Sequence, residues 1–539
     1  MVDADLKAQV DNLIRIGIAL SSELDIDELL EMILDESRRF TRADGGTLYI
    51  LSDDGKHLRA KIAQTDTLGY RIGGASNVDI DEQVFAPIPL AIDGQMNLAN
   101  VSAYVANTGK SVNIEDVFET EEFDFAGPRQ FYKKVGFRTQ SMLVVPLKNH
   151  EDDITGVLML VNAQNAELAE VIQFSPEHEA LINALASQAA VGITNAQLII
   201  DLKSLFDSFI QSIAAAIDEK STYTGGHIRR VADLTMMLAE EINRTEEGLW
   251  GHLNFTEDEL NELRIAAWMH DVGKITTPDY VVDKATKLET IFDRVEFVRA
   301  RYEVLKRDAE IAALRKKLEL VAGDTAESAE WMEIEASCEQ EIAGLRDEMA
   351  FIAQCNTGGE YMADEDLDRI REIASLTFDL DGEAQQRLTE DEVHNLSIRK
   401  GTLTDDERNV INNHAEVSIK MLSQLPFSKT LKKVPEYAGG HHEKLNGKGY
   451  PNGLSAEQLP LQARIMAVAD IFEALTAPDR PYREPMTLSQ SLKIMGFMVK
   501  DEELDGRIVD LLKESGLVFT YANRELRKDQ LDVAEGEKL

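Results

Sequence analysis

The stretch His441-His-Glu-Lys-Leu-Asn-Gly-Lys-Gly-Tyr-Pro451 places two adjacent imidazoles and a carboxylate at the head of a glycine-rich segment. From about residue 200 onward the chain carries apolar residues at helical spacing, and Gly and Pro occur mainly at breaks between elements. The stretch is therefore predicted to be a loop within an all-α domain.

Five of the ten histidines stand in informative surroundings after residue 220. His227 follows Thr222-Tyr-Thr-Gly-Gly226 on a predicted helix, and the pair His270-Asp271 ends a predicted helix, Leu263–Met269. A lone histidine of this kind is usually a hydrogen-bonded core residue, and a lone aspartate often caps a helix. The five histidines, with two aspartates of the same region, are His227, His270, His414, His441, His442, Asp271 and Asp470.

Taken together, these side chains offer enough nitrogen and oxygen ligands for two cations such as iron or manganese. The two cysteines, Cys338 and Cys355, are too few and too isolated for a thiolate site. In an adjacent His-Asp pair the carboxylate can bridge two metals while the imidazole binds one of them. Such a metal pair activates a water and stabilises the entering and leaving oxygens of a phosphodiester.

The motifs resemble those of the HD-GYP phosphodiesterases. His270-Asp-Val-Gly-Lys274 is similar to the HD signature of that family, and His441–Pro451 is similar to its GYP signature. Further similarity lies in Ala463-Arg-Ile-Met-Ala-Val-Ala-Asp470 and in Ala474-Leu-Thr476 with Arg480-Pro-Tyr-Arg483. The resemblance runs from about Ser204 to Thr520 and is interrupted by a long insertion. It implies a site for two divalent metal ions, iron or manganese, held by His227, His270, Asp271, His414, His441, His442 and Asp470.

The same resemblance implies roles in catalysis for Asp271 and Lys274, with Lys274 near the scissile phosphate as a charge stabiliser or proton donor. It also implies substrate contacts by Lys274, Tyr450, Arg480 and Arg483, because a guanidinium presents paired donors to phosphate or guanine. A purely structural role for the two arginines is the alternative.

Three departures from the family pattern bear on these expectations. Relatives with a third metal carry a glutamate one helical turn before the first histidine, and Tyr223 stands there, so two metals are predicted. Asn446 replaces the aspartate of many relatives, with a small expected effect. The segment of about residues 287–400 is predicted to form two long helices folded back on each other, and it is expected partly to cover the site.

The N-terminal part has a different pattern. A helix is predicted around Leu13–Leu20 and a second from Asp25 to Phe40, followed by strands at Thr47–Leu51 and His57–Ile62 that flank a turn at Asp53-Asp54-Gly55. Two further apolar strands are predicted at Met142–Leu147 and Gly156–Val161. Together these elements predict an α+β domain.

Three segments of this part resemble the core of GAF domains: Val105–Val117, Gly136–Leu147 and Gly156–Asn162. GAF domains that bind cyclic nucleotides carry an Asn-Lys, Phe, Asp-Glu signature, where this chain has Asn162-Ala163, Phe174 and His178-Glu179. Cyclic-nucleotide sensing is therefore not expected, and the GAF ligand is unknown. A GAF domain that serves only dimerisation and signal relay is the alternative.

A continuous helix is predicted to join the two domains, because no proline occurs from Glu177 to Thr277 and apolar residues continue at helical spacing. Its apolar stripe favours pairing with a second copy in a parallel homodimer, and packing within the same chain is the competing reading. The domain boundaries predicted are 1–198 for the GAF domain with its N-terminal helix, 199–222 for the connecting helix and 204–525 for the HD-GYP domain.

Composition narrows the class of partners. A formal net charge of -41 argues against general binding to nucleic-acid polymers or to anionic membranes. The N-terminus lacks the pattern of a signal peptide, and the sparse cysteines agree with a reducing compartment, so a cytoplasmic location is expected.

The predicted function is hydrolysis of cyclic di-GMP to pGpG, or onward to GMP, under control of the GAF domain. Three alternatives remain: hydrolysis of another cyclic dinucleotide such as cyclic GMP-AMP, a receptor that binds the dinucleotide with little or no turnover, and a deoxynucleotide triphosphohydrolase. The last would need the HD residues but not His441–Pro451.

Overall fold

The computed structural model describes residues 25–76, 78–165, 170–220, 226–322, 328–359, 361–477 and 485–534. The helix predicted around Leu13–Leu20 lies outside these residues. The chain forms two compact units, Met1–Phe206 and Asp207–Leu539. Among the described residues, no helix is long and apolar enough to cross a membrane.

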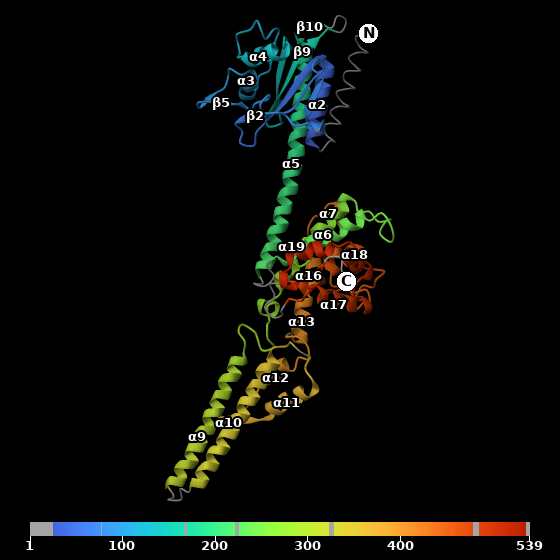
Figure 1. Cartoon of the computed structure of the whole chain (residues 1–539). Coiled ribbons are helices and arrows are strands. Elements are labelled where there is room, and N and C mark those ends of the chain that lie inside the picture. Colours follow the sequence, from blue (N-terminus) through green and yellow to red (C-terminus); the bar gives the residue numbers. More distant parts are fainter. Residues whose placement is uncertain are drawn as a thin grey trace. The chain divides into compact units, whose positions relative to one another are not determined.

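The first unit is built on an antiparallel sheet with the strand order β3-β2-β1-β9-β8-β7, extended by β10 beside β9 and β4 beside β2 (Figure 1). Its strands are β1 Ala43–Leu51, β2 His57–Thr65, β3 Tyr70–Gly73, β4 Ile88–Pro89, β5 Ala91–Ile92, β6 Gln95–Met96, β7 Val112–Ile114, β8 Met142–Lys148, β9 Ile154–Gln164 and β10 Val171–Ile172. Its helices are α2 Ile26–Thr41, η1 Gly74–Ser76, α3 Val101–Thr108, α4 Ala126–Val135 and the start of α5, Pro176–Lys220.

Two apolar layers cover the faces of this sheet. On one face α2 and the first turns of α5 pack through residues such as Leu30 and Ile182, and on the other face α3 packs through Val105. Asp25 starts α2 by accepting hydrogen bonds from the backbone N–H groups of Asp27 and Glu28. The predicted helix from Asp25, the predicted hairpin and the predicted strand pair are all confirmed, and so is the α+β class of this unit.

The second unit is largely helical, as predicted. Its elements after the end of α5 are α6 His227–Arg244, α7 Glu257–Met269, η2 Val272–Thr276, α8 Asp279–Val282, α9 Val295–Ala322, α10 Ser328–Asn356, α11 Asp364–Ser375, β11 Thr377–Leu380, β12 Glu383–Gln386, α12 Glu390–Leu396, α13 Asp405–Asn412, α14 His414–Leu422, η3 Lys429–Leu431, α15 Val434–Gly439, α16 Leu461–Thr476, α17 Leu488–Lys500, α18 Gly506–Glu514, α19 Leu517–Glu525 and η4 Lys528–Gln530.

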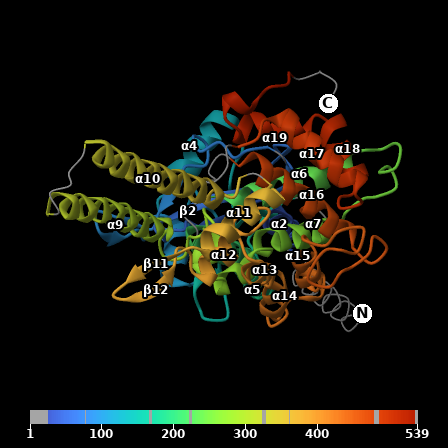
Figure 2. The same cartoon turned by 90° about the horizontal axis from the view of Figure 1, so that it is seen from below.

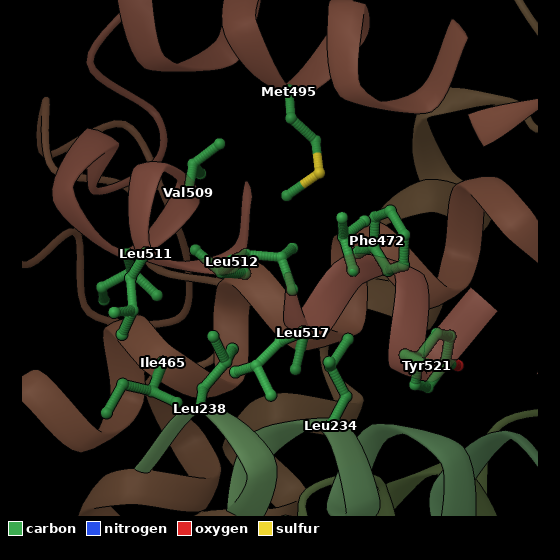
Figure 3. Packing of buried hydrophobic residues seen from close by; sticks show 14 of the residues in the cluster. Leu234, Leu238, Ile465, Phe472, Met495, Val509, Leu511, Leu512, Leu517 and Tyr521 are labelled. Carbon is green, nitrogen blue, oxygen red and sulfur yellow. The ribbon is translucent and has the colours of Figure 1, made fainter. Parts of the chain in front are cut away.

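The main core of this unit fixes the helices that carry the candidate site. Leu234 and Leu238 of α6 point into a cluster that also contains Phe472 of α16, Met495 of α17 and Leu512 of α18 (Figure 3). All five side chains are fully buried. Truncating one of them to alanine would cost about 2–5 kcal/mol of unfolding free energy, because the surroundings relax only partly around the cavity.

The long insertion contains the predicted pair of helices, α9 and α10, which lie side by side in both views (Figures 1 and 2). Tyr302 of α9 is fully buried against Met349 and Ile352 of α10. The expectation that this part is almost wholly helical is wrong in one place, because β11 and β12 form a two-stranded ribbon. The residues Asp381 and Gly382 turn the ribbon with positive φ angles of 54° and 85°.

Candidate metal centre

The seven predicted donors come from five different places in the second unit. His227 is the first residue of α6, His270 follows the last residue of α7, and Asp271 precedes η2. His414 begins α14, His441 and His442 follow the end of α15, and Asp470 lies within α16. Helix ends therefore supply most of the candidate donors, while α16 contributes a donor from its buried face.

These side chains converge. Asp271 Oδ2 lies 3.2 Å from His270 Nε2 and 3.5 Å from His227 Nε2, while Asp271 Oδ1 lies 3.3 Å from His414 Nε2. Asp470 Oδ1 lies 3.4 Å from His227 Nε2, and its Oδ2 lies 4.0 Å from His442 Nδ1. The rings of His441 and His442 stand with centroids 3.9 Å apart, and the ring of His441 lies 4.7 Å from that of His270. Asp271 thus presents its two oxygens to different imidazoles.

Four of the converging atoms are buried without a hydrogen-bond partner: His270 Nε2, Asp271 Oδ1, His414 Nε2 and His441 Nε2. A buried polar atom left without a partner is costly, so a group of four such atoms that face one another fits a site that binds a cation. Two sets of donors have atoms close enough to hold one metal ion each, His227 with His270 and Asp271, and His414 with His441 and His442. The residues present therefore fit a metal centre.

Three of the rings are oriented in the same way. The Nδ1 atoms of His270, His414 and His441 lie 2.7, 2.5 and 2.6 Å from the carbonyl oxygens of the residues three positions earlier, Ala267, Ile411 and Ala438. A carbonyl oxygen can only accept, so each Nδ1 carries the proton and each Nε2 is left with a free lone pair. Metal-ligating histidines are commonly held in this way.

His227 is oriented by a carboxylate that the sequence did not reveal. Its Nδ1 lies 2.5 Å from Glu473 Oε2, and the other oxygen of Glu473 accepts a hydrogen bond from Arg230. Glu473 lies one helical turn after Asp470 on the buried face of α16 and is fully buried. The spacing between Asp470 and Glu473 is the only sequence signal for this residue, and it is shared by many ordinary helices.

Ser418 of α14 was also missed. Its hydroxyl donates to the carbonyl of His270 and accepts from the backbone N–H of Gly273, both at 2.9 Å. A Cβ at Gly273 would lie 2.0 Å from the carbonyl oxygen of His414, so only glycine allows this approach. Together, Ser418 and Gly273 fix the turn after Asp271 against the helix that begins with His414.

The charges around the donors differ from one side to the other. Burial alone would lower the pKa of His227, but Glu473, Asp271 and Asp470 raise this pKa to about 10. Burial and the neighbouring His270 lower the pKa of His441 to about 3. Burial would raise the pKa of Asp271, yet Lys274 and His270 hold this pKa well below its usual value. The ionised carboxylates therefore keep His227 protonated while His441 is neutral, and a cation bound among these carboxylates would replace that proton.

The structure describes two of the four residues that are predicted to contact substrate, Lys274 and Tyr450. Lys274 Nζ donates to Asp271 Oδ2 at 2.6 Å. The ring of Tyr450 lies 4.8 Å from that of His442, and burial raises the pKa of Tyr450, so its hydroxyl keeps its proton. Arg480 and Arg483 lie outside the described residues, and so does Tyr223. Asn446 makes only backbone contacts, since its side chain donates to the carbonyl of Asp501 and accepts from the N–H of Lys448.

In the first unit, the positions of the cyclic-nucleotide signature make internal contacts. Asn162 accepts from the N–H of Gln140 and donates to the carbonyl of Arg138. Phe174 is buried, and Glu179 accepts a hydrogen bond from Asn113. These contacts give the residues structural roles within the GAF unit.

Comparisons with known protein families match both units. The GAF domain family matches residues 25–193, and two HD domain families match residues 224–344 and 390–508. The first HD match contains His227, His270 and Asp271, and the second contains the remaining four donors. The two HD matches thus lie on either side of the middle of the insertion.

Curated relatives match shorter segments. The chain is 38% identical over 115 residues to a cyclic di-GMP phosphodiesterase response regulator of Xanthomonas campestris, with 21% of this chain and 30% of that protein covered. It is 40% identical over 114 residues to a 3'3'-cGAMP-specific phosphodiesterase of Vibrio cholerae, with 21% and 26% covered. It is 34% identical over 98 residues to a cyclic di-GMP phosphodiesterase of Thermotoga maritima, with 18% and 26% covered.

The chain therefore spans about a third or less of the length of these relatives. The family matches, the converging donors and the two signatures agree with one another along the chain. The chain joins a segment matched by the GAF domain family to segments matched by two HD domain families.

Proposed function

We propose that the chain is a metal-dependent phosphodiesterase that hydrolyses cyclic di-GMP to pGpG, with GMP as a further product. The observation that carries this proposal is the convergence of five imidazoles and two carboxylates, four of whose buried atoms have no hydrogen-bond partner. The names of the relatives from Xanthomonas campestris and Thermotoga maritima support the substrate class.

The proposed metal content is two divalent ions, iron or manganese. Asp271 stands between the two sets of imidazoles and is placed to bridge, while Asp470 lies near His227 and His442. When bound, such a metal pair would supply Lewis acidity, activating a water and stabilising the entering and leaving oxygens of a phosphodiester.

The protein side chains add charge and a proton. Lys274 places an ammonium at the edge of the donor cluster, 22% exposed at its side chain. From there it would stabilise the charge of the phosphate and donate a proton to the leaving oxygen. Tyr450 would donate a hydrogen bond from its protonated hydroxyl to the substrate. Arg480 and Arg483 remain proposed contacts to phosphate or guanine.

The runner-up substrate is a cyclic GMP-AMP, since one relative from Vibrio cholerae is named for activity on 3'3'-cGAMP. A deoxynucleotide triphosphohydrolase would not need His441 and His442, which lie inside the donor cluster. A receptor without turnover would not need the full set of donors, because the loss of one ligand would leave binding in place.

The GAF domain is proposed to regulate the site through α5, which begins in the first unit and ends in the second. Its ligand is not identified. Leu198, Leu202, Leu205 and Phe209 of α5 are 57, 66, 67 and 60% exposed and recur at steps of four and three residues. This spacing favours a parallel coiled coil with a second copy, so we propose a homodimer. Partial cover of the site by the insertion and a cytoplasmic location stay predictions.

The test of this function compares substrates directly. Protein loaded with manganese or iron is incubated with cyclic di-GMP and, separately, with 3'3'-cGAMP, and the products are followed by chromatography. We expect pGpG to accumulate faster than the product of cGAMP, and Asp271→Ala to abolish turnover. Tight binding of cyclic di-GMP without product would favour the receptor, and faster turnover of cGAMP would favour the runner-up.

A further inference from the structure

Three side chains in the last turns of α5 contact the elements that carry the donors. Asp207 accepts a hydrogen bond from Arg264 of α7, the helix that ends at His270. Asp218 accepts from the backbone N–H of Gly226, the residue before His227. The end of α5 is thus attached to two of the segments from which the metal donors start.

The third contact reaches the turn of Lys274. Lys220, the last residue of α5, donates a hydrogen bond to the carbonyl of Ile275 at 2.6 Å. Ile275 follows Lys274 within η2. Lys220 Nζ also lies 3.7 Å from Asp279, but that carboxylate is 75% exposed and such a pair contributes little. The ammonium is within hydrogen-bond distance of the carbonyl of Ile275 but not of Asp279, so the bond to Ile275 is the stronger contact.

The opposite side of the same turn is fixed by α14. Gly273 donates to Ser418, and the carbonyl of Lys274 accepts from the N–H of Thr277. Lys220 therefore holds η2 from the side of α5, and Ser418 holds it from the side of α14. The direction in which Lys274 leaves the turn depends on both contacts.

The same part of α5 borders the donors across a cleft. Ile217, Asp218 and Lys220 line a narrow cleft of about 10 Å³ together with His227, Asp271 and Lys274. Ile217 is 5% exposed, so this side chain is packed where α5 borders the cleft. The end of α5 is therefore a wall of the candidate active site.

We propose that Lys220 is a positioning residue that holds the ammonium of Lys274 in place through the carbonyl of Ile275. This inference rests on the proposed function for its effect on turnover, but the contact itself does not. A shift of α5 that lengthens the bond from Lys220 to Ile275 releases η2 and moves Lys274 away from Asp271. Movement of this helix end then changes the rate of the chemical step without removing a metal ligand.

The experiment uses the full-length, metal-loaded chain and three variants. Lys220→Met removes the donor and keeps the length of the side chain, while Lys220→Arg keeps a charged donor. Lys203→Met is the matched control, since Lys203 is exposed on the same helix, 17 residues before Lys220. We expect kcat for cyclic di-GMP to fall about tenfold to a hundredfold in Lys220→Met, with KM and metal content unchanged. Lys220→Arg restores most of kcat, and Lys203→Met stays within twofold of the wild type.

A second measurement does not depend on turnover. Hydrogen–deuterium exchange of the peptide covering residues 271–282 is compared among the same proteins, since the N–H groups of Lys274 and Thr277 are bonded within the turn. Faster exchange in Lys220→Met than in Lys203→Met supports the proposal even if the wild type binds metal but cleaves no cyclic dinucleotide, an outcome that would reject only the function. Unchanged exchange, an equal effect of both variants, or loss of metal in Lys220→Met overturns it.

Discussion

His227 depends on a single carboxylate for its orientation, because Glu473 accepts the proton of its Nδ1 atom. Glu473→Gln keeps the size of the side chain but removes the charge that fixes the ring. We expect the affinity for manganese to fall about tenfold to a hundredfold, since partners of metal ligands typically have effects of this size. Isothermal titration calorimetry of the metal-free protein with manganese measures this affinity.

The control for Glu473 is a carboxylate that pairs with the neighbouring arginine of α6. Glu525 of α19 pairs with Arg229 as Glu473 pairs with Arg230, but it contacts none of the donors. Glu525→Gln is therefore expected to leave metal affinity within twofold of the wild type. Equal affinities for all three proteins would mean that His227 needs no carboxylate to bind metal.

The sequence was sufficient to predict which side chains converge but not the residues that orient them. Histidines next to aspartate or glycine in a chain with few histidines are conspicuous, whereas Glu473 and Ser418 look like ordinary helix residues. Glu473 meets His227 across 246 positions of the chain, and Ser418 meets Gly273 across 145. These contacts form because α16 and α14 pack against other helices. No local sequence pattern predicts such packing.

The turn η2 and the start of α14 approach each other at Gly273. Gly273→Ala would place a methyl group 2.0 Å from the carbonyl oxygen of His414, so backbone must move. We expect a loss of about 1–3 kcal/mol in unfolding free energy and a clear loss of bound metal. Thermal unfolding and metal analysis of the purified variant check both.

Gly496 in α17 is the comparison for that variant. A Cβ there meets nothing within 4 Å, and the residue lies inside a helix. Gly496→Ala is expected to raise the unfolding free energy by about 0.5–1 kcal/mol, because alanine restricts the unfolded chain. A destabilised Gly496→Ala, or a Gly273→Ala with full metal content, would contradict the packing described for these elements.

A carboxylate at the start of α18 makes the unfolding free energy of the second unit depend on pH. Asp505 caps this helix, and although burial would raise its pKa, the guanidinium groups of Arg507 and Arg464 hold it below the usual value. A carboxyl group with a lowered folded pKa contributes stability above its unfolded pKa and loses it as the pH falls toward the folded pKa. We expect Asp505→Asn to cost about 1–3 kcal/mol at pH 7, with the difference shrinking below about pH 4.

Urea unfolding of the wild type and of Asp505→Asn at pH 7, 5, 4 and 3, followed by the fluorescence of the second unit, measures this difference in unfolding free energy. A cost that stays constant down to pH 3 would show that the ion pairs of Asp505 do not set its contribution.

At the level of elements, the long periodic segments were predictable and the short irregular ones were not. The apolar residues of α9 and α10 that pack around Tyr302 recur every three or four positions, so the sequence shows the periodicity of a helix. The β11–β12 ribbon is largely exposed and carries no buried face that a period of two could reveal. Its only signal is the dipeptide Asp381-Gly382, which favours a two-residue hairpin turn.

The whole molecule is predicted to pair through α5. Leu205→Glu places a charge in the exposed apolar stripe, and two such charges would face each other in a parallel pair. Light scattering at micromolar concentration is expected to show a dimer for the wild type and a monomer for Leu205→Glu. Leu249→Glu, at a residue that is 62% exposed outside this helix, should remain dimeric. A monomeric wild type would reject the pairing.

The division into a GAF domain and an HD domain could be predicted because each has its own pattern of elements and signatures. The effect of one domain on the other could not be predicted, since we propose that it depends on contacts such as that of Lys220 with Ile275. These contacts join residues that have no distinctive neighbours in the sequence.

The most direct measurement is the metal content of anaerobically purified protein, determined by mass spectrometry for the wild type and Asp271→Ala. Asp271 presents its two oxygens to both sets of imidazoles, so its removal should disturb both metal positions. We expect two equivalents of iron or manganese per chain in the wild type and a loss of most of both in the variant. A wild type without bound metal after loading, or a variant that keeps two equivalents, would contradict the assignment of these seven side chains to a metal centre.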